Sequence, residues 1–367
     1  MKNTLGTHLS VTLFGESHGE AVGCVLDGLC PGLSVDEGRI AAFLTLRRPC
    51  GGFSTARREP DNFRIVSGVY NGKTTGTPLC ILIPNERQNS ADYAGMNDLP
   101  RPGHADFSAR CKYHGFEDPR GGGHFSGRLT APLVAAGAIA VQALERREIL
   151  LGTHVLRCAG IADRAFSNLS VELPYLNTQP FPVLDEAAAE AMKAAILAAA
   201  QAGDSVGGVL ETAVLGLPAG VGEPWFDTLE GLLSHALFSI PAVKGVEFGD
   251  GFALASLRGS EANDAFCLKE GRIVTQTNRS GGINGGLSNG MPLVLRTAVK
   301  PTPSIRLPQR TVDLASGEER ELQITGRHDP AIVHRAAIVQ TGLTALVLLD
   351  ALTGRYGADA FLTEGAF

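Results

Sequence analysis

The sequence predicts an α+β protein in which strands and helices surround a buried central helix. Short segments typical of strands are interspersed with helices, and neither a solenoid repeat nor a linker interrupts them, so we expect one domain over residues 1–367. The segment from Ala331 to about Leu352 is apolar nearly all round, which is typical of a helix at the centre of a protein. A Rossmann fold is not favoured, because no G-x-G-x-x-G motif opens a βαβ unit at the N-terminus.

Composition limits the classes of function. The chain is 44% hydrophobic and 19% charged, as in ordinary globular proteins, and its net charge of −6 argues against a nucleic-acid partner. Its seven cysteines are scattered without a CxxC pair, which indicates free thiols in a reducing cytoplasm. The N-terminal residues lack the apolar core of a targeting segment. No apolar run reaches 18 residues, so no membrane span is expected.

The local patterns predict the elements in order. Strands are expected over residues 7–14, 22–29, 63–70, 77–83, 150–162, 206–215 and 291–299. Helices are expected from a capping box at Ser34-Val-Asp-Glu37 through Leu46, over Leu129–Leu144, from a cap at Asp185 to Ala202, and over 226–238. Residues 85–128 are expected to be mostly irregular and functional, and residues 174–184 to form a connection.

A glycine-rich loop, Gly121-Gly-Gly-His-Phe-Ser-Gly127, runs directly into the apolar segment that begins at Leu129. Four glycines in seven residues permit positive φ angles and a close approach to a ligand. The first N–H groups of the following helix suit an anion, and Arg128 adds a planar fork of donors. The pattern is equally consistent with a tight turn before a core helix.

Three of the nine histidines, His18, His104 and His328, lie in polar inserts flanked by glycine or proline. Histidine titrates near neutrality and is the usual general acid or base. For each one alone, a structural or surface role is the better interpretation, but the similar contexts favour a shared site. No pair has the spacing of a zinc site, so no metal is expected.

Further polar residues allow both a chemical and a structural interpretation. Asp329 followed by proline before an apolar helix fits an N-cap, or else a positioned proton acceptor. Arg47 and Arg48 end a helix, where the helix dipole favours cations whether or not a ligand binds there. Lys300-Pro-Thr-Pro-Ser304 offers a cation and two hydroxyls for a phosphate, or forms an edge-strand turn.

Seven motifs in order resemble the chorismate synthase family and span nearly the whole chain. They are Gly15-Glu-Ser-His-Gly19, Arg58-Glu-Pro-Asp61, Arg101-Pro-Gly-His-Ala-Asp106, the Gly121 loop, Ala242-Val-Lys-Gly-Val-Glu247, Lys300-Pro-Thr and Gly326-Arg-His-Asp-Pro330. Each motif alone is weak, whereas the ordered set is highly specific.

The resemblance implies a cytoplasmic lyase of the shikimate pathway and of aromatic amino acid biosynthesis. Such enzymes convert 5-enolpyruvylshikimate 3-phosphate into chorismate and phosphate by a 1,4-anti elimination that requires reduced FMN. The implied fold is a layered β-α-β sandwich with antiparallel sheets around central helices, and the implied assembly is a homotetramer. Some members reduce their flavin with NADPH; this chain has no recognisable additional nicotinamide domain, so an external reductant is expected.

The resemblance also assigns roles to residues. His18 resembles the histidine that protonates the departing phosphate, His104 the one that protonates the reduced flavin, and Asp329 the carboxylate that acts with flavin N5 in removing the C6 hydrogen. The residues that resemble substrate contacts are Arg47, Arg48, Arg101, Ser126, Arg128 and Arg327. The residues that resemble FMN contacts are His124, Phe125, Ser126, Ala242, Gly285, Lys300, Thr302, Ser304 and Arg327.

The chain departs from the commoner family loop Gly-Gly-Arg-Ser-Ser-Ala-Arg-Glu-Thr. The substituted positions are His124, Phe125, Gly127 and Leu129, and elsewhere Phe53 and Pro241 replace a common arginine and a common asparagine. These differences are interpreted as subgroup variation, because every candidate for proton transfer is retained. Two alternatives remain: a flavin-dependent lyase or reductase acting on a related anionic cyclohexene, and a non-catalytic flavin- or phosphate-binding paralogue.

Overall fold

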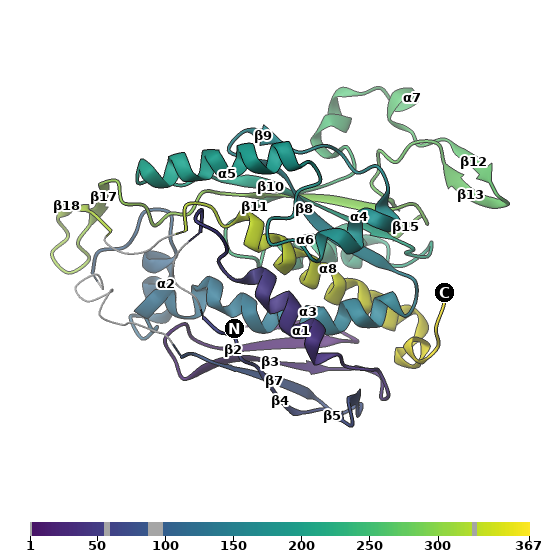
Figure 1. The fold of residues 1–367 in the computed structure, drawn as a ribbon, viewed down its shortest axis with the longest axis horizontal. Helices are drawn as coiled ribbons and strands as arrows, with labels where there is room; N and C mark the ends of the chain where they lie inside the picture. Colours follow the sequence, from purple (N-terminus) through teal and green to yellow (C-terminus); the bar gives the residue numbers. More distant parts are fainter. Residues whose placement is uncertain (1, 55–58, 87–97, 325–328) are drawn as a thin grey trace.

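The computed structural model describes residues 2–54, 59–86, 98–324 and 329–367. Two five-stranded sheets enclose a layer of helices, and every strand pairing in the described part of the chain is antiparallel (Figure 1). This arrangement confirms the predicted α+β class and the layered sandwich.

The first sheet is built from the N-terminal quarter of the chain in the order β1-β2-β3-β7-β4. Its strands are β1 (Thr4–Leu5), β2 (Ser10–Gly15), β3 (Ala21–Asp27), β7 (Leu79–Pro84) and β4 (Arg64–Ser67). In β7 every second side chain is buried, namely Leu79, Ile81 and Ile83. This alternation gives the sheet one face toward the helices and one face toward water.

The second sheet has the order β11-β16-β10-β8-β9. Its strands are β11 (Val243–Phe248), β16 (Leu293–Val299), β10 (Gly208–Leu215), β8 (Leu150–Cys158) and β9 (Ile161–Ala162). The predicted strand over 150–162 is therefore split, because Ala159 and Gly160 both take positive φ angles at a turn.

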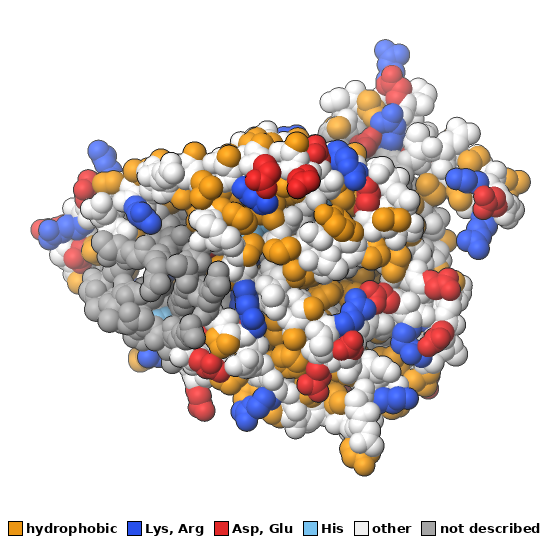
Figure 2. Space-filling view, viewed as in Figure 1, with side chains coloured by type: hydrophobic (Ala, Val, Ile, Leu, Met, Phe, Trp, Pro, Cys, Tyr) orange, Lys and Arg blue, Asp and Glu red, His pale blue; other side chains and the backbone are white. Residues whose placement is uncertain are grey.

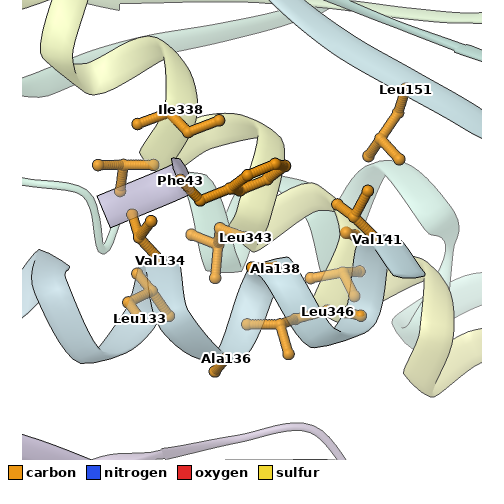
Figure 3. Close-up of a cluster of buried hydrophobic side chains, with 14 of the residues drawn as sticks. Phe43, Leu133, Val134, Ala136, Ala138, Val141, Leu151, Ile338, Leu343 and Leu346 are labelled. Carbon is orange, nitrogen blue, oxygen red and sulfur yellow. The ribbon is translucent and has the colours of Figure 1, made fainter. Parts of the chain in front are cut away.

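Helices α1 (Glu37–Arg47), α3 (Thr130–Glu145) and α8 (Val333–Tyr356) fill the space between the sheets (Figure 1). Figure 3 shows side chains from α1, α3, α8 and β8 pointing toward one another, among them Phe43, Val141, Leu151 and Leu343. Helix α6 (Leu229–Leu237) packs on α8 from the side of the second sheet. Burial of these apolar faces is the main stabilising term of the fold.

Helices α3 and α8 approach each other at a pair of glycines. A Cβ atom added at Gly137 would lie 2.4 Å from Gly342 Cα, whereas one added at Gly342 would lie 3.3 Å from Gly137 Cα. Both distances are shorter than ordinary van der Waals contact, so the backbones touch where no side chain can fit.

The two helices are long and apolar enough to cross a membrane by length and composition. In the structure they are core helices, because 83% of the Gly127–Glu145 window and 89% of the Val333–Tyr356 window are buried inside the protein. Their hydrophobicity is accounted for by the two sheets that cover them.

Smaller elements cover or project from the sandwich. These are α2 (Asp106–Tyr113), α4 (Leu169–Leu176), α5 (Glu186–Gln201), α7 (Gly259–Ala262), and the hairpins β5–β6 (Val69–Tyr70, Lys73–Thr74), β12–β13 (Phe266–Lys269, Arg272–Thr275), β14–β15 (Ile283–Asn284, Leu287–Ser288) and β17–β18 (Gln309–Val312, Glu319–Leu322). Helix α5 lies outside the second sheet, and β12–β13 projects from the opposite end of the molecule to α2 (Figure 1). Both signs of charge are interspersed over the face in Figure 2.

Four helices differ from those expected. Helix α1 is capped by Asp36, which accepts a hydrogen bond from Arg39 N, and not by Ser34. Helix α2 forms within the stretch expected to be irregular, and α4 extends into the expected connection with Pro174 inside it. Helix α8 begins at Val333, so Asp329 is not its N-cap.

A buried ionic network joins the central strands of the second sheet. The imidazole of His154 contacts Asp163 Oδ2 through Nδ1 at 2.7 Å and Glu211 Oε2 through Nε2 at 3.1 Å. Arg296 donates to the other oxygen of Glu211 at 2.7 Å. Burial opposes protonation of His154, but its hydrogen bonds to the two carboxylates outweigh burial and raise its pKa. Burial also opposes ionisation of Asp163 and Glu211, but their hydrogen bonds with His154 outweigh burial and lower the pKa of both.

We predict that Gly137→Ala destabilises the protein although alanine is the better helix former. The added methyl group meets the α8 backbone, which costs more than the ~1 kcal/mol gained in helix propensity. Urea unfolding would measure the free energy of unfolding. Gly342→Ala is the matched control and should cost less, because its added atom meets Gly137 at the longer distance of 3.3 Å. A Gly137→Ala protein as stable as the wild type would contradict this packing.

We predict that His154 stabilises the protein most in mildly acidic solution. The raised pKa of His154 gives stability that is fully present below about pH 6.5, the ordinary histidine pKa, and is lost as the pH rises through the pKa of the folded state. The lowered pKa values of Asp163 and Glu211 give stability that is lost as the pH falls below about 4. His154→Gln should therefore cost ~3 kcal/mol near pH 6 and less at pH 9. Urea unfolding across pH measures this difference, and His235→Gln is the control because His235 is an exposed residue of α6. A cost that does not change with pH would reject the charged network.

Candidate active site

The glycine-rich loop brings two of the candidate histidines together. Gly121 and Gly122 have φ angles of 61° and 82° in a 3-10 segment (Arg120–Phe125). A Cβ at Gly121 would lie 2.6 Å from the His18 ring, and one at Gly122 would lie 3.3 Å from His104 Cε1. Glycine is therefore required twice over, by the backbone conformation and by the rings that lie against it.

The turn that carries His18 is attached to the glycine loop by hydrogen bonds. Ser17 N donates to Gly123 O at 3.1 Å, and His124 Nδ1 lies 2.9 Å from Gly15 O. His18 itself is only 3% exposed. The turn between β2 and β3 thus holds His18 in a fixed place beside the loop.

His104 is oriented by a carboxylate at the start of α2. Its Nδ1 lies 2.5 Å from Asp106 Oδ1, and Arg101 Nε donates to Asp106 Oδ2 at 2.7 Å. Because a carboxylate only accepts, Nδ1 carries the proton of this pair and Nε2 is the ring nitrogen left for other partners. Burial opposes ionisation of Asp106, but hydrogen bonds from Arg101 and His104 hold its pKa far below the usual range.

The turn after β16 lies beside the same group. Lys300 Nζ donates to the carbonyl of Gly103, and Arg101 NH1 lies 3.4 Å from Ser304 Oγ. Lys300 N donates to Ala242 O at 3.0 Å, which places Ala242 next to the turn. The hydroxyl oxygen of Thr302 is buried and has no hydrogen-bond partner within the described parts of the chain.

Three arginines surround one buried carboxylate. Asp61 Oδ2 accepts from Arg47 NH2 at 2.7 Å, and Asp61 Oδ1 accepts from Arg128 NH1. Arg48 Nε lies 3.6 Å from Asp61 Oδ2, and Arg48 NH2 donates to Pro60 O. We call Arg47, Arg48 and Arg128 the arginine cluster.

Members of the arginine cluster differ in exposure. The side chain of Arg48 is 30% exposed, whereas those of Arg47 and Arg128 are 6% exposed. Arg128 is also tied to the end of β7, because its Nε donates to Asn85 Oδ1 at 2.8 Å and its NH2 donates to Pro84 O at 3.1 Å. Burial lowers the pKa of Arg47, and the neighbouring Asp61 opposes that shift.

Asp329 lies before α8 and pairs with a residue of that helix. Arg335 NH1 donates to Asp329 Oδ2, and Arg335 Nε donates to Arg47 O at 2.8 Å. Arg335 therefore joins Asp329 to the C-terminal end of α1. The alternative of a helix cap for Asp329 is wrong, and the carboxylate lies beside the arginine cluster instead.

Asn85 completes the connection between the histidines and the arginine cluster. While its Oδ1 accepts from Arg128, its Nδ2 donates to Glu16 O at 3.0 Å and Gly19 O at 2.9 Å, on either side of His18.

A small pocket also opens between the glycine loop and α2, and is lined in part by Arg101, His104, Gly122 and Phe125.

Some predicted site residues lie elsewhere or outside the described residues. Gly285 lies in the turn between β14 and β15, close to Gly282, whose added Cβ would meet Pro292 and Leu293 at the start of β16. Lys300 follows the other end of that strand, so Gly285 lies apart from this group within one chain. Phe125 is partly exposed and contacts Tyr113 edge-on at 6.0 Å, and Ser126 accepts a hydrogen bond from Arg128 N. Arg327 and His328 lie outside the described residues, as does Arg58 of the second motif.

Four residues with contacts in the site were not predicted as site residues: Asp61, Asn85, Asp106 and Arg335. Asp61 and Asp106 end two of the recognised motifs, so a signal for them was present. Arg335 stands alone in an apolar helix segment, six residues after Asp329, and such a segment is an unusual place for a charge.

Comparison with known proteins identifies the family of the chain. The family model described as chorismate synthase matches residues 9–353. The chain belongs to the chorismate synthase family. Its curated relatives named chorismate synthase include one from Pyrococcus abyssi, 47% identical over 95% of this chain and 97% of the relative, and one from Thermococcus gammatolerans, 49% identical over 95% and 97%. Another, from Aeropyrum pernix, is 46% identical over 99% of this chain and 95% of the relative.

A crystal structure of chorismate synthase has the same fold. It superposes with a TM-score of 0.76 at 28% sequence identity and covers 96% of this chain and 94% of its own. Membership of the chorismate synthase family makes this protein an enzyme, a lyase of the pathway to aromatic compounds. The comparisons do not favour the alternative of a non-catalytic paralogue.

We predict that Gly121→Ala lowers kcat/KM by at least ~100-fold, because the new methyl group displaces the His18 ring. Gly115→Ala is the matched control: Gly115 has a φ of 81°, but nothing lies within 4 Å of an added Cβ. Both variants should lose ~1–2 kcal/mol of stability to backbone strain, as measured by thermal unfolding. Steady-state kinetics should show the loss in Gly121→Ala alone, and equal kinetics in the two variants would contradict the contact.

Proposed function

We propose that this chain converts 5-enolpyruvylshikimate 3-phosphate into chorismate and phosphate by a 1,4-anti elimination that depends on reduced FMN. The observation that carries the proposal is the meeting of two histidines on consecutive glycines, next to an arginine cluster and a carboxylate. Such a site combines anion binding with several groups able to transfer protons.

The substrate carries two carboxylates and a phosphate, and these charges require cationic partners in a partly buried site. The arginine cluster and Arg101 supply fixed guanidinium groups, and Arg48 is the most exposed of the cluster. We propose that these residues, with Ser126 and Arg327, bind the substrate.

The residues around the turn after β16 fit a flavin mononucleotide. The buried Thr302 hydroxyl is available for a phosphate or ring oxygen, and Lys300 and Ser304 supply a cation and a second hydroxyl beside it. We propose that these three residues hold FMN with Ala242, His124, Phe125, Ser126 and Arg327. When bound, reduced FMN supplies an electron-rich ring that stabilises the charge developed as phosphate leaves.

The proton transfers fall to three side chains. We propose that His18, held against the glycine loop, gives a proton to the departing phosphate. Asp106 holds the Nδ1 of His104, so Nε2 is the atom at which His104 would exchange a proton with bound reduced FMN. Asp329, held by Arg335 at the end of α1, accepts the proton removed from C6 of the substrate.

The assembly and its surroundings are also proposals. We propose a cytoplasmic homotetramer in which residues 1–367 of each chain form one domain. An external reductant supplies the electrons that maintain reduced FMN. The alternative is that this chain itself reduces FMN with NADPH, which the assay below tests.

An anaerobic assay that follows chorismate formation with chemically reduced FMN tests the reaction. Chorismate formation only in the presence of reduced FMN is the expected result. FMN binding without turnover would support the non-catalytic alternative, and turnover of a different anionic cyclohexene would support the other lyase. Repeating the assay with oxidised FMN and NADPH separates an external from an internal reductant.

We predict that His18→Ala, His104→Ala and Asp329→Asn each lower kcat by ~10²–10⁴-fold, the usual contribution of a general acid or base. FMN binding, measured by titration calorimetry, should persist in His18→Ala. The control is His235→Gln, because His235 lies exposed on α6. Since Asp329 does not cap α8, asparagine tests proton acceptance at this position. Near-normal turnover of Asp329→Asn would show that a group other than Asp329 is the base.

A further inference from the structure

Asp61 is the shared acceptor of the arginine cluster. Its side chain is fully buried, and its two oxygens face different elements: Oδ2 faces Arg47 and Arg48 at the end of α1, and Oδ1 faces Arg128 just before α3. No other described acidic side chain is paired with the cluster. One carboxylate therefore sets the relative positions of three guanidinium groups.

The backbone at Asp61 is also unusual. Its φ angle of 52° lies in the left-handed region, which costs a residue other than glycine free energy. Arg48 donates to the carbonyl of the preceding Pro60, so the same cluster holds both the turn and its side chain. The surrounding contacts thus maintain a strained conformation that directs the carboxylate toward the arginines.

The arginine cluster keeps donors for a further anion. The Nε groups of Arg47 and Arg48 are buried and have no hydrogen-bond acceptor among the residues that the structure describes. Three guanidinium charges against one carboxylate leave a net charge of about +2, which an incoming phosphate or pair of carboxylates would balance. Burial opposes ionisation of Asp61, but Arg47 and Arg128 outweigh it and lower its pKa, so the carboxylate is charged at neutral pH.

We propose that Asp61 is a positioning residue that fixes the spacing of the arginine cluster and supplies its counter-charge before the anionic substrate binds. This inference rests on the proposed role of the arginine cluster in substrate binding. It assigns Asp61 two separable properties, a charge that limits how strongly simple anions bind and a geometry that turnover requires.

Asp61→Asn separates these properties, because it removes the charge with little change in size. Inorganic phosphate should bind about tenfold more tightly to Asp61→Asn than to the wild type. The Asp61 charge no longer neutralises the arginine cluster, so the bound phosphate becomes its main counter-charge. The value of kcat/KM should fall by at least ~100-fold, because the amide nitrogen that replaces one carboxylate oxygen is a donor and leaves either Arg47 or Arg128 without its acceptor. Calorimetric titration at constant ionic strength and steady-state kinetics measure the two effects, which have opposite signs.

Asp264→Asn is the matched control. Asp264 also accepts several hydrogen bonds, from Thr277 Oγ1 and from the main chain of Arg279 and Ser280, but it lies two residues before β12 of the hairpin that projects from the molecule. The variant changes the net charge by the same amount, and both phosphate affinity and kcat/KM should stay within ~2-fold of the wild type. Equal phosphate tightening in both variants would overturn the proposal by showing a general charge effect.

Asp61→Glu keeps the inference testable if the asparagine variant does not fold. Glutamate retains the charge, so phosphate affinity should stay within ~2-fold, while the extra methylene displaces the guanidinium groups and lowers kcat/KM. Normal kcat/KM in the glutamate variant, or phosphate affinity in Asp61→Asn equal to that of the wild type, would overturn the proposal. If the wild type forms no chorismate, the proposed function fails, whereas the phosphate titrations still decide the role of Asp61.

Discussion

Gly137 of α3 and Gly342 of α8 meet without a side chain between them, and this lets the two helices lie at backbone contact between two sheets. The site depends on that contact because the N-terminal ends of both helices lie beside the site. The glycine loop and Arg128 come directly before α3, whereas Asp329 precedes α8 and Arg335 lies in its first turn. A change in the distance between the helices would move the histidines relative to Asp329.

The site also depends on polar side chains that join separate elements. Asp61 links α1 to the start of α3, Arg335 links α1 to the start of α8, and Asn85 links Arg128 to the turn that carries His18. Each link spans parts of the chain that only the complete sandwich brings together. The positions of the proposed catalytic groups are therefore a property of the whole fold and not of any single loop.

Much of this arrangement could be predicted from the sequence. The long apolar segment after Asp329 was correctly placed at the centre, because a helix that is apolar on all sides can only be covered from all sides. The motifs around His18, His104 and Lys300 predicted a common site, and the structure brings these three loops together. Local patterns did less well where tertiary contacts decide, as in α2, whose short sequence is mostly polar and has no side-chain cap at its N-terminus.

The partners of the charged residues could not be predicted in the same way. Arg128 meets Asp61 across 67 residues, and Arg335 meets the Arg47 carbonyl across 288. No periodicity relates residues so far apart, and an arginine has the same local pattern whether it faces a ligand or a buried carboxylate. The helix cap proposed for Asp329 failed for this reason, since the Asp-Pro pattern describes the local chain and Arg335 decides where the carboxylate lies.

The position of α8 in the chain has a consequence for how the protein is made. The first sheet is complete by residue 84, α3 by residue 145 and the second sheet by residue 299, so a ribosome delivers α8 after both layers that cover it. Helix α8 therefore emerges from the ribosome after the parts of the chain that cover it. Until it does, α3 lacks the helix that its backbone contacts at Gly137. The two apolar helices can meet only once residues 333–356 have been synthesised, so the active fold cannot form earlier.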